Sequence, residues 1–300
     1  MEAAACYRHP SHETYVSCVR CERPICTDCM TVASVGHQCP GCVKEGRQSV
    51  RRARTVFGGA VTSAVTPVVT YALIALNVVA YVMEVVRPEV VERFGMLGAV
   101  LTGPDGALYY YEGVSAPGFE LTGVAGGEWY RLLTGAFLHL EPDQSFGVMH
   151  LVFNMLALWN LGRMVEGRLG RSRFLGLYLL SAVGGSVLVY ALAPETLTVG
   201  ASGAVFGLAA AFWVISRRLN HDMGPVNRFL AGLLLWMVVS ALFTSWQGHL
   251  GGLLTGALVT AGLAYAPPRL RTGPVQALGG VLLLGLLALV VVARTAALTG

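Results

Sequence analysis

Seven apolar stretches, each about as long as a membrane span, fill most of this 300-residue chain after its first 64 residues. They lie at 65–86, 147–165, 173–193, 200–216, 229–246, 249–266 and 275–294. An α-helix needs about 20 apolar residues to cross the hydrocarbon core of a bilayer. A composition of 54% hydrophobic and 13% charged residues is also unlike that of a soluble domain. The sequence therefore predicts an all-α polytopic membrane protein with seven transmembrane helices.

The arginines indicate how these helices are oriented. They gather beside four connections that fall on one side of the membrane, while the connections 194–199 and 245–248 contain neither arginine nor lysine. The four groups are Arg51, Arg52 and Arg54; Arg163, Arg168, Arg171 and Arg173; Arg217, Arg218 and Arg228; and Arg269 and Arg271. Because cytoplasmic loops carry the excess of positive charge, the pattern predicts a cytoplasmic N-terminus and, after seven spans, an external C-terminus.

The cysteines divide the chain into regions. All seven lie between Cys6 and Cys42, ahead of the first apolar stretch. The first thirty residues hold five of them and no apolar core of a signal peptide, so we expect the N-terminus to be retained. The sequence predicts a cysteine- and histidine-rich zinc-binding domain at 1–46, a basic linker at 47–64 and a membrane domain at 65–295.

A serine and a histidine at the starts of two predicted spans carry the chemistry that we expect. Ser202 lies in Gly200-Ala201-Ser202-Gly203, and His249 opens the sixth span. A serine hydroxyl becomes a good nucleophile only beside a base, which is usually histidine. Polar groups at membrane depth are costly and often functional. No aspartate lies inside a span, and Glu84 and Glu166 are expected at other sides or depths, so the sequence favours a Ser202–His249 dyad without a carboxylate.

Further residues suit the same reaction. His150 and Asn154 are spaced i, i+4 on one helix face and, with the free backbone N–H of Ser202, could stabilise an oxyanion. Two faces of small residues would let two helices pack closely, with Phe206 available to stack on His249. Those faces are Gly203 and Gly207 on one helix and Gly252 and Gly256 on the other, while Gly200 and Gly203 carry no side chain that would block close approach to the serine. The alternative for Ser202 alone is ordinary packing, since serine and glycine are common in membrane helices.

With these motifs in order, the segment from Trp129 to Tyr265 resembles the rhomboid family of intramembrane serine proteases. The matching motifs are Trp129-Tyr130-Arg131, His150-x3-Asn154, Gly200-Ala201-Ser202-Gly203 and His249-x2-Gly252-x3-Gly256. The resemblance implies a six-plus-one helical bundle in which Ser202 is the nucleophile, His249 the base, and His150, Asn154 and the Ser202 amide the oxyanion site. It implies cleavage of transmembrane segments of other proteins without a catalytic cofactor. Phe206 replaces the tyrosine of many members, and the glutamate matched by Glu166 has a structural role.

The N-terminal head predicts two zinc ions. Four ligand pairs, Cys6/His9, Cys18/Cys21, Cys26/Cys29 and Cys39/Cys42, give eight ligands for two closed tetrahedral sites. A disulfide framework is the alternative, but seven cysteines cannot all pair and the cytoplasm is reducing. Cross-braced ligation is favoured, in which Cys6, His9, Cys26 and Cys29 bind one ion and Cys18, Cys21, Cys39 and Cys42 the other. Ligation by neighbouring pairs stays open, with His12 and His37 as competing ligands.

The head resembles B-box-type zinc fingers, except that its last pair is cysteine where histidine is usual. Similar heads occur in certain actinobacterial rhomboids, which implies a bacterial plasma membrane. The resemblance implies a protein partner rather than nucleic acid, since residues 1–46 hold four basic and five acidic side chains. Two other functions remain: a catalytically silent rhomboid-like protein that binds membrane helices, and a transporter with a zinc-finger head.

Overall fold

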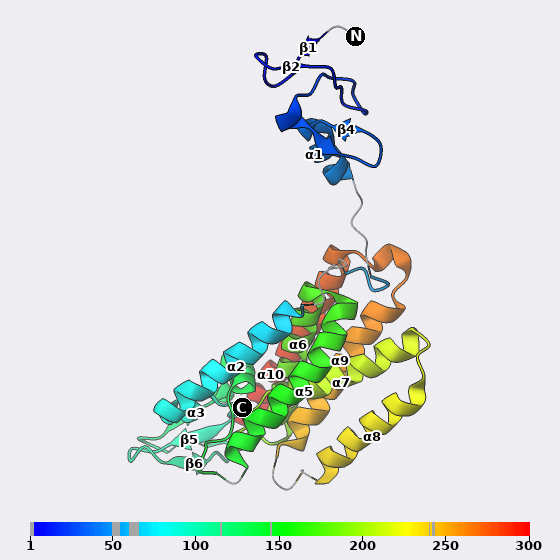
Figure 1. Cartoon of the computed structure of the whole chain (residues 1–300). Helices are drawn as coiled ribbons and strands as arrows, with labels where there is room; N and C mark the ends of the chain where they lie inside the picture. Colours follow the sequence, from blue (N-terminus) through cyan, green and yellow to red (C-terminus); the bar gives the residue numbers. More distant parts are fainter. Residues whose placement is uncertain are drawn as a thin grey trace. The chain divides into compact units, whose positions relative to one another are not determined.

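The computed structural model describes residues 3–49, 55–59, 66–114, 116–144, 146–239, 241 and 244–300. It divides the chain into two compact units, Met1–Ala53 and Arg54–Gly300, which we describe separately (Figure 1). Arg51, Arg52 and Arg54 and most of the predicted linker lie outside the described residues.

The N-terminal unit is built from two short hairpins and one helix. Strands β1 (Ala4–Ala5) and β2 (Glu13–Thr14) pair, as do β3 (Thr31–Val32) and β4 (His37–Gln38). A 3₁₀ turn η1 (Thr27–Cys29) lies between the hairpins, and helix α1 (Pro40–Ser49) ends the unit. Its buried apolar side chains are six cysteines and Ile25. So small a core does not usually hold a domain of this size without bound metal or disulfides.

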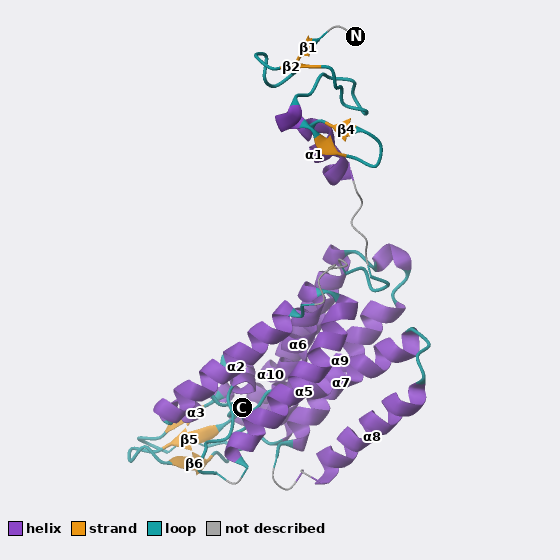
Figure 2. Ribbon diagram, viewed as in Figure 1, coloured by secondary structure: helices purple, strands orange, loops and turns teal. Residues whose placement is uncertain are grey.

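The second unit is a helical bundle, as the sequence predicts (Figure 2). Its long helices are α2 (Val68–Val86), α5 (Gly147–Leu169), α6 (Arg171–Leu192), α7 (Ser202–Arg218), α8 (Met223–Val239), α9 (Trp246–Tyr265) and α10 (Gly273–Thr299). Each corresponds to one predicted span. Four of them, α2, α5, α6 and α10, are long and apolar enough to cross a membrane, whereas α8 is apolar but only 17 residues long.

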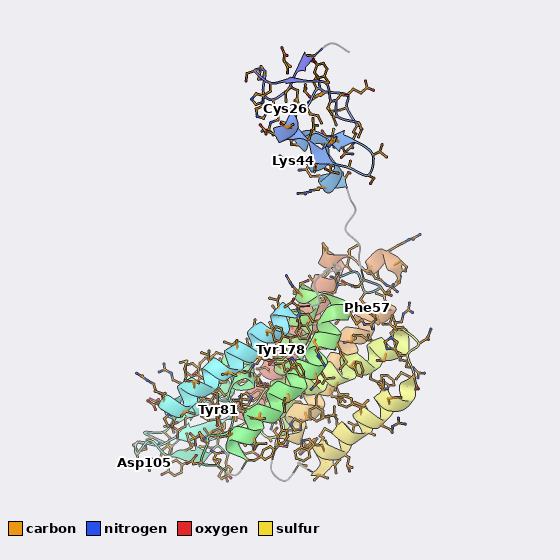
Figure 3. The ribbon with its side chains drawn as sticks, in the orientation of Figure 1. Cys26, Lys44, Phe57, Tyr81, Asp105 and Tyr178 are labelled. Carbon is orange, nitrogen blue, oxygen red and sulfur yellow. The ribbon has the colours of Figure 1, made fainter. Side chains whose placement is uncertain are left out.

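Helix α7 lies at the centre of the bundle. It packs against α5, α6 and α9, and it contributes Ala204, Val205, Leu208 and Ala211 to the main core. Tyr178 of α6 is fully buried in the same core and is labelled in Figure 3. Helix α8, in contrast, packs chiefly on α7 and lies at the edge of the bundle (Figure 1).

Helices α7 and α9 approach each other through glycine. A β-carbon on Gly252 would overlap the backbone of Gly203, and one on Gly256 would overlap the backbone of Gly207. Any larger side chain at these positions would therefore push the helices apart. This contact sets the separation of the two helix starts, where Ser202 and His249 lie.

The connection between α2 and α5 is folded rather than extended. It contains α3 (Glu89–Phe94), a three-stranded antiparallel sheet and the short helices η2 (Val124–Gly126), α4 (Arg131–Thr134) and η3 (Gly135–Phe137). The sheet has the order β6-β5-β7, with β5 (Val100–Thr102) between β6 (Leu108–Tyr110) and β7 (Glu120–Thr122). Residues 131–137 of this connection thus form two short helical turns.

Arg131 organises this connection. Its side chain is 3% exposed and donates to the carbonyl oxygens of Glu92 and Gly95, at 2.7 and 2.9 Å. Its Nε also donates to Glu128 Oε2 at 2.7 Å, and Glu128 accepts the backbone N–H of Gly123. One guanidinium group therefore joins α3, the turn before α4 and the segment that follows the sheet.

Glu166 of α5 has a structural position, as the sequence analysis expected. Its buried carboxylate accepts the backbone N–H groups of Val69 and Thr70, at 3.1 and 2.9 Å, and the Thr70 hydroxyl at 2.8 Å. These are free groups in the first turn of α2, where a negative charge is favoured. Glu166 thus caps α2 and ties it to α5.

Candidate active site and metal centres

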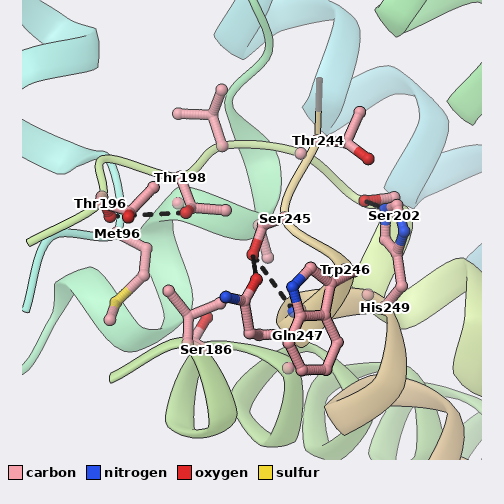
Figure 4. Close-up of a pocket in the computed structure, with 18 of the residues that line it drawn as sticks. Met96, Ser186, Thr196, Thr198, Ser202, Thr244, Ser245, Trp246, Gln247 and His249 are labelled. Atoms are coloured by element: carbon pink, nitrogen blue, oxygen red, sulfur yellow. Dashed lines mark hydrogen bonds between the residues drawn. The ribbon is translucent and has the colours of Figure 1, made fainter. Parts of the chain in front are cut away.

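The Ser202 hydroxyl and the His249 imidazole are in hydrogen-bond contact. The distance from His249 Nε2 to Ser202 Oγ is 2.9 Å, although the residues are 47 positions apart. Ser202 is the first residue of α7, and His249 lies in the first turn of α9. Both line one cavity of about 410 Å³, in which Figure 4 shows their side chains together. A serine hydroxyl and an imidazole that could act as its base thus meet in one hollow.

A helix cap and an aromatic ring position His249. Ser245 caps α9 by accepting the N–H of Gly248, which fixes the start of the helix just before His249. The Phe206 ring stacks on the imidazole, with ring centroids 4.5 Å apart and an angle of 15° between the planes. His249 Nδ1 is buried and has no hydrogen-bond partner among the described residues. Among the described residues, Ser202 and His249 therefore form a pair, and no carboxylate bonds to the histidine.

The start of α7 supplies a backbone donor. As the first helical residue, Ser202 has an N–H with no partner inside the helix, at the end where the helix dipole favours negative charge. Gly200 precedes it with φ of 132°, a conformation that strongly favours glycine. A β-carbon on Gly200 would lie 2.8 Å from His150 Cε1 and 3.6 Å from Ser202 Oγ. Gly200 thus leaves room for His150 beside the serine.

His150 and Asn154 lie in different places relative to this cavity. His150 lines it, and its Nδ1 accepts the backbone N–H of Leu140 at 3.3 Å. In a neutral imidazole the other nitrogen, Nε2, then carries the proton and is a donor. Asn154 is buried, does not line the cavity, and donates its side-chain N–H to the carbonyl of His150 at 2.9 Å. The structure therefore brings His150, but not the Asn154 side chain, to the serine.

The surroundings of His150 are not predicted from the sequence. Glu84, which was expected away from the Ser202–His249 pair, accepts the backbone N–H of His139 on its Oε2 at 2.9 Å. The His139 ring lies 5.2 Å from the His150 ring, between centroids. Glu84 is 1% exposed and His139 is fully buried. A glutamate inside a predicted span was the available signal, because such residues are rare without a function.

In the N-terminal unit, two clusters of four side chains could each hold a metal ion. Within each cluster, the ligand atoms lie within 4.8 Å of one another. The clusters are Cys6, His9, Cys26 and Cys29, and Cys18, Cys21, Cys39 and Cys42. These are the cross-braced sets that the sequence analysis favoured, and neighbouring-pair ligation is wrong for this structure. All seven cysteines are free in this structure, which agrees with the metal-binding interpretation rather than the disulfide alternative.

The spacing within the clusters suits zinc. The sulfur atoms of Cys21 and Cys39 are 3.7 Å apart, whereas a disulfide would need about 2.05 Å. Four bonds of about 2.3 Å to a tetrahedral ion place two sulfurs about 3.75 Å apart. His12 forms a third group with Cys26 and Asp28, but that group shares Cys26 with the first cluster. His37, in β4, belongs to neither cluster.

The cysteine pKa values show why these clusters favour a cation. Burial opposes the thiolate of Cys6, but nearby backbone N–H groups lower its pKa to about 6. Burial and the adjacent Cys6 and Cys26 raise the pKa of Cys29 to about 11. The Cys29 thiol is therefore not ionised near neutral pH by itself. A bound cation would favour its thiolate.

Comparisons with known proteins agree with this arrangement. The model of the Rhomboid domain matches residues 126–266, which include Ser202, His249, His150 and Asn154. YdcA, a rhomboid-type protein of Bacillus subtilis, is 34% identical over 148 residues, which cover 48% of this chain and 71% of YdcA. The chain belongs to the rhomboid family. As a rhomboid protein with helices long and apolar enough to span a bilayer, it is an integral membrane protein.

Two other rhomboid relatives are named as proteases. Rhomboid protease GluP of Bacillus subtilis is 32% identical over 169 residues, which cover 54% of this chain and 31% of GluP. Rhomboid protease AarA of Providencia stuartii is 28% identical over 173 residues, covering 48% of this chain and 59% of AarA. The chain thus spans less than two thirds of the length of GluP and AarA. The cysteine-rich head lies outside the matched Rhomboid domain and fits a zinc-finger-like module.

Proposed function

We propose that this rhomboid protein is an intramembrane serine endopeptidase that cleaves transmembrane segments of other membrane proteins. The contact of 2.9 Å between His249 Nε2 and Ser202 Oγ carries the proposal. A serine and a histidine from separate helices rarely meet in a buried cavity for packing alone, because burying polar groups is costly. The protease names of GluP and AarA support the same reaction class.

In the proposed reaction, Ser202 Oγ attacks the carbonyl carbon of the scissile peptide as His249 Nε2 takes the hydroxyl proton. The oxyanion that forms accepts hydrogen bonds from the Ser202 N–H and from His150 Nε2–H. His249 then gives its proton to the leaving amine, and the C–N bond breaks to leave an acyl-enzyme. Water, deprotonated by His249, then attacks the ester carbonyl; as the C–O bond to Ser202 breaks, His249 returns the proton to Ser202 Oγ and the new carboxyl terminus is released.

Other residues would position the proposed Ser202–His249 pair. Phe206 would keep the His249 ring in the plane from which Nε2 reaches Ser202, and Gly203, Gly252 and Gly256 would keep α7 and α9 close. Asn154 is proposed as a further oxyanion donor. Its amide now bonds to the carbonyl of His150, so it would have to change side-chain rotamer to reach the oxyanion. No catalytic cofactor is needed in this scheme.

The proposed substrate is a membrane helix that unwinds near its outer end. A helical peptide bond has its carbonyl in an intrahelical bond, so it must leave the helix before Ser202 can attack. We therefore expect segments with glycine or other residues of low helix propensity to be cut in preference to uniformly Leu-rich ones. The partners of the membrane domain are then the lipid bilayer and such transmembrane proteins.

We further propose a bacterial plasma membrane location with the N-terminus in the cytoplasm and the C-terminus outside. The arginine pattern supports this orientation. In this arrangement the starts of α7 and α9 face outward, which gives water access to the cavity. A reaction that consumes water inside a bilayer requires such access.

For the N-terminal unit we propose two structural zinc ions and a protein partner, with no nucleic acid. Each site would be closed, because four protein ligands leave no position for substrate. The alternative for the whole chain is a silent rhomboid-like protein that binds membrane helices. The presence of both Ser202 and His249, within 2.9 Å of each other, argues against it.

A serine-directed fluorophosphonate tests the proposed nucleophile directly. We expect it to label the purified protein at Ser202 and not at Ser186, which lines the same cavity but has no hydrogen bond to a histidine among the described residues. His249→Ala should slow labelling by at least about 10²-fold, since the base is then missing. A protein labelled equally well in the Ser202→Ala variant would contradict the proposal.

A further inference from the structure

We propose that Glu84 is a positioning residue that sets the tautomer of His150. The inference rests on the oxyanion role proposed above for His150. Glu84 is a carboxylate with 1% exposure in α2, a helix long and apolar enough to span a membrane. Such a group is expensive to bury and marks a function more often than packing.

The first contact joins Glu84 to the connection ahead of α5. Its Oε2 accepts the backbone N–H of His139 at 2.9 Å. His139 lies between η3 and α5, in no helix or strand, so no regular structure fixes its backbone. The carboxylate therefore holds this peptide unit against α2.

The second contact joins the next residue to His150. The backbone N–H of Leu140 donates to His150 Nδ1 at 3.3 Å. Because Glu84 holds the neighbouring peptide unit, it also fixes where the Leu140 N–H points. An imidazole nitrogen that accepts a hydrogen bond carries no proton, so the proton of neutral His150 must be on Nε2.

The His150 ring extends from the Leu140 contact to the cavity. His150 Nε2 lies next to Gly200, where an added β-carbon would be 3.0 Å away, and His150 lines the same hollow as Ser202. An oxyanion needs a donor at this point. If the Leu140 contact were lost, the ring could also carry its proton on Nδ1 and would then present a lone pair to the negative oxygen. Glu84 would thus act on catalysis through a peptide unit and a ring, without touching the substrate.

Neighbouring groups provide matched controls. Tyr81 lies one turn before Glu84 on α2, its hydroxyl is buried without a partner among the described residues, and its ring meets the His139 ring edge-on at 6.3 Å. Tyr81→Phe should therefore change the same pocket without affecting the tautomer. Glu166 is, among the described residues, another buried carboxylate bonded to backbone N–H groups, but it caps α2 rather than holding His139. Glu166→Leu should lower stability and leave His150 unchanged.

The experiment measures the His150 tautomer by ¹⁵N NMR of the full-length protein with labelled histidine in detergent, using His150→Gln to assign the signal. In the wild type we expect the proton on Nε2. In Glu84→Leu we expect a mixture of tautomers, whereas Glu84→Gln, which keeps a carbonyl acceptor for the His139 N–H, should restore the wild-type signal. Tyr81→Phe and Glu166→Leu should match the wild type.

The kinetic counterpart uses a fluorogenic transmembrane substrate. Removing an oxyanion donor completely costs about 10²–10³ in kcat, so a partial loss in Glu84→Leu should lower kcat about tenfold with KM nearly unchanged, and Glu84→Gln should recover most of it. A wild-type proton on Nδ1 would overturn the inference even if no variant folded. So would a folded Glu84→Leu protein whose His150 signal is unaltered. Because the NMR measurement needs no substrate, it separates failure of this inference from failure of the proposed protease function.

Discussion

The Phe206 ring lies almost parallel to the His249 imidazole, with centroids 4.5 Å apart and 15° between the planes. Phe206 is one turn below Ser202 on α7, so the helix that carries the proposed nucleophile also orients the proposed base. His249 is thus linked to α7 twice, by its hydrogen bond to Ser202 and by its stacking on Phe206.

Phe206→Leu should lower kcat about three- to tenfold. Aromatic stacking contributes about 0.5–1.5 kcal/mol beyond the burial of area, and without it the imidazole can tilt away from Ser202. Phe206→Tyr keeps the ring and should retain most activity. The measurement is steady-state cleavage of one substrate by the three proteins. Equal kcat values for wild type and Phe206→Leu would show that the stack does not orient His249.

Gly252→Ala should destabilise the membrane unit, because its β-carbon would overlap the backbone of Gly203. Overpacking of this kind costs about 1–3 kcal/mol. The matched control is Gly262→Ala on the same helix, where a β-carbon meets nothing within 4 Å and alanine is the better helix former. Thermal unfolding in detergent compares them. A Gly252→Ala protein as stable as Gly262→Ala would contradict the close approach of α7 and α9.

The N-terminal unit should hold two zinc ions per chain. Elemental analysis by mass spectrometry should give two for the wild type and about one for Cys29→Ala or Cys39→Ala, since each removes a ligand from one cluster only. His12→Ala and His37→Ala should retain two, because neither histidine belongs to a cluster of four. Loss of an ion from His12→Ala would mean that His12 rather than His9 completes the first site.

The ion pair between Glu128 and Arg131 should make stability depend on pH. Burial tends to raise the Glu128 pKa, but the bonds from Arg131 and the Gly123 N–H outweigh it and leave the pKa below its ordinary value. A carboxyl with a lowered folded-state pKa stabilises the protein above its unfolded pKa of about 4.3, and this contribution is lost as the pH falls through the folded pKa.

Glu128→Gln should therefore unfold at a lower temperature than wild type at pH 7, with the gap closing below about pH 4. Since Glu128 is partly exposed, the gap should be small, about 1 kcal/mol or less. Thermal unfolding of both proteins across this pH range is the measurement. A gap that is constant with pH would show that the Glu128 charge makes no contribution.

Much of this arrangement could be predicted from the sequence because it is local. Apolar stretches of span length mark helices, and a small-residue motif with serine or histidine at a helix start identifies Ser202 and His249. The ligand pairs of the zinc head likewise follow from spacing, and the cross-braced choice matches the structure. These features depend on neighbours within one or two turns.

What the sequence did not reveal depends on contacts between distant segments. Strands β5, β6 and β7 are three residues each, too short for an alternating pattern to stand out in a long connection. The link from Glu84 to His139 joins residues 55 positions apart, and no local pattern indicates it. Asn154 shares a helix face with His150, as predicted, but its side-chain rotamer turns it to the His150 carbonyl.

Cleavage of a panel of transmembrane substrates by the purified protein in liposomes tests the central claim, with wild type compared with Ser202→Ala and His249→Ala. We predict cleavage by wild type and a loss of at least about 10³-fold in both variants, since removing a member of a catalytic pair removes most of its effect. The proteins should unfold at similar temperatures, so that the loss reflects chemistry. Cleavage that persists in Ser202→Ala would contradict the account.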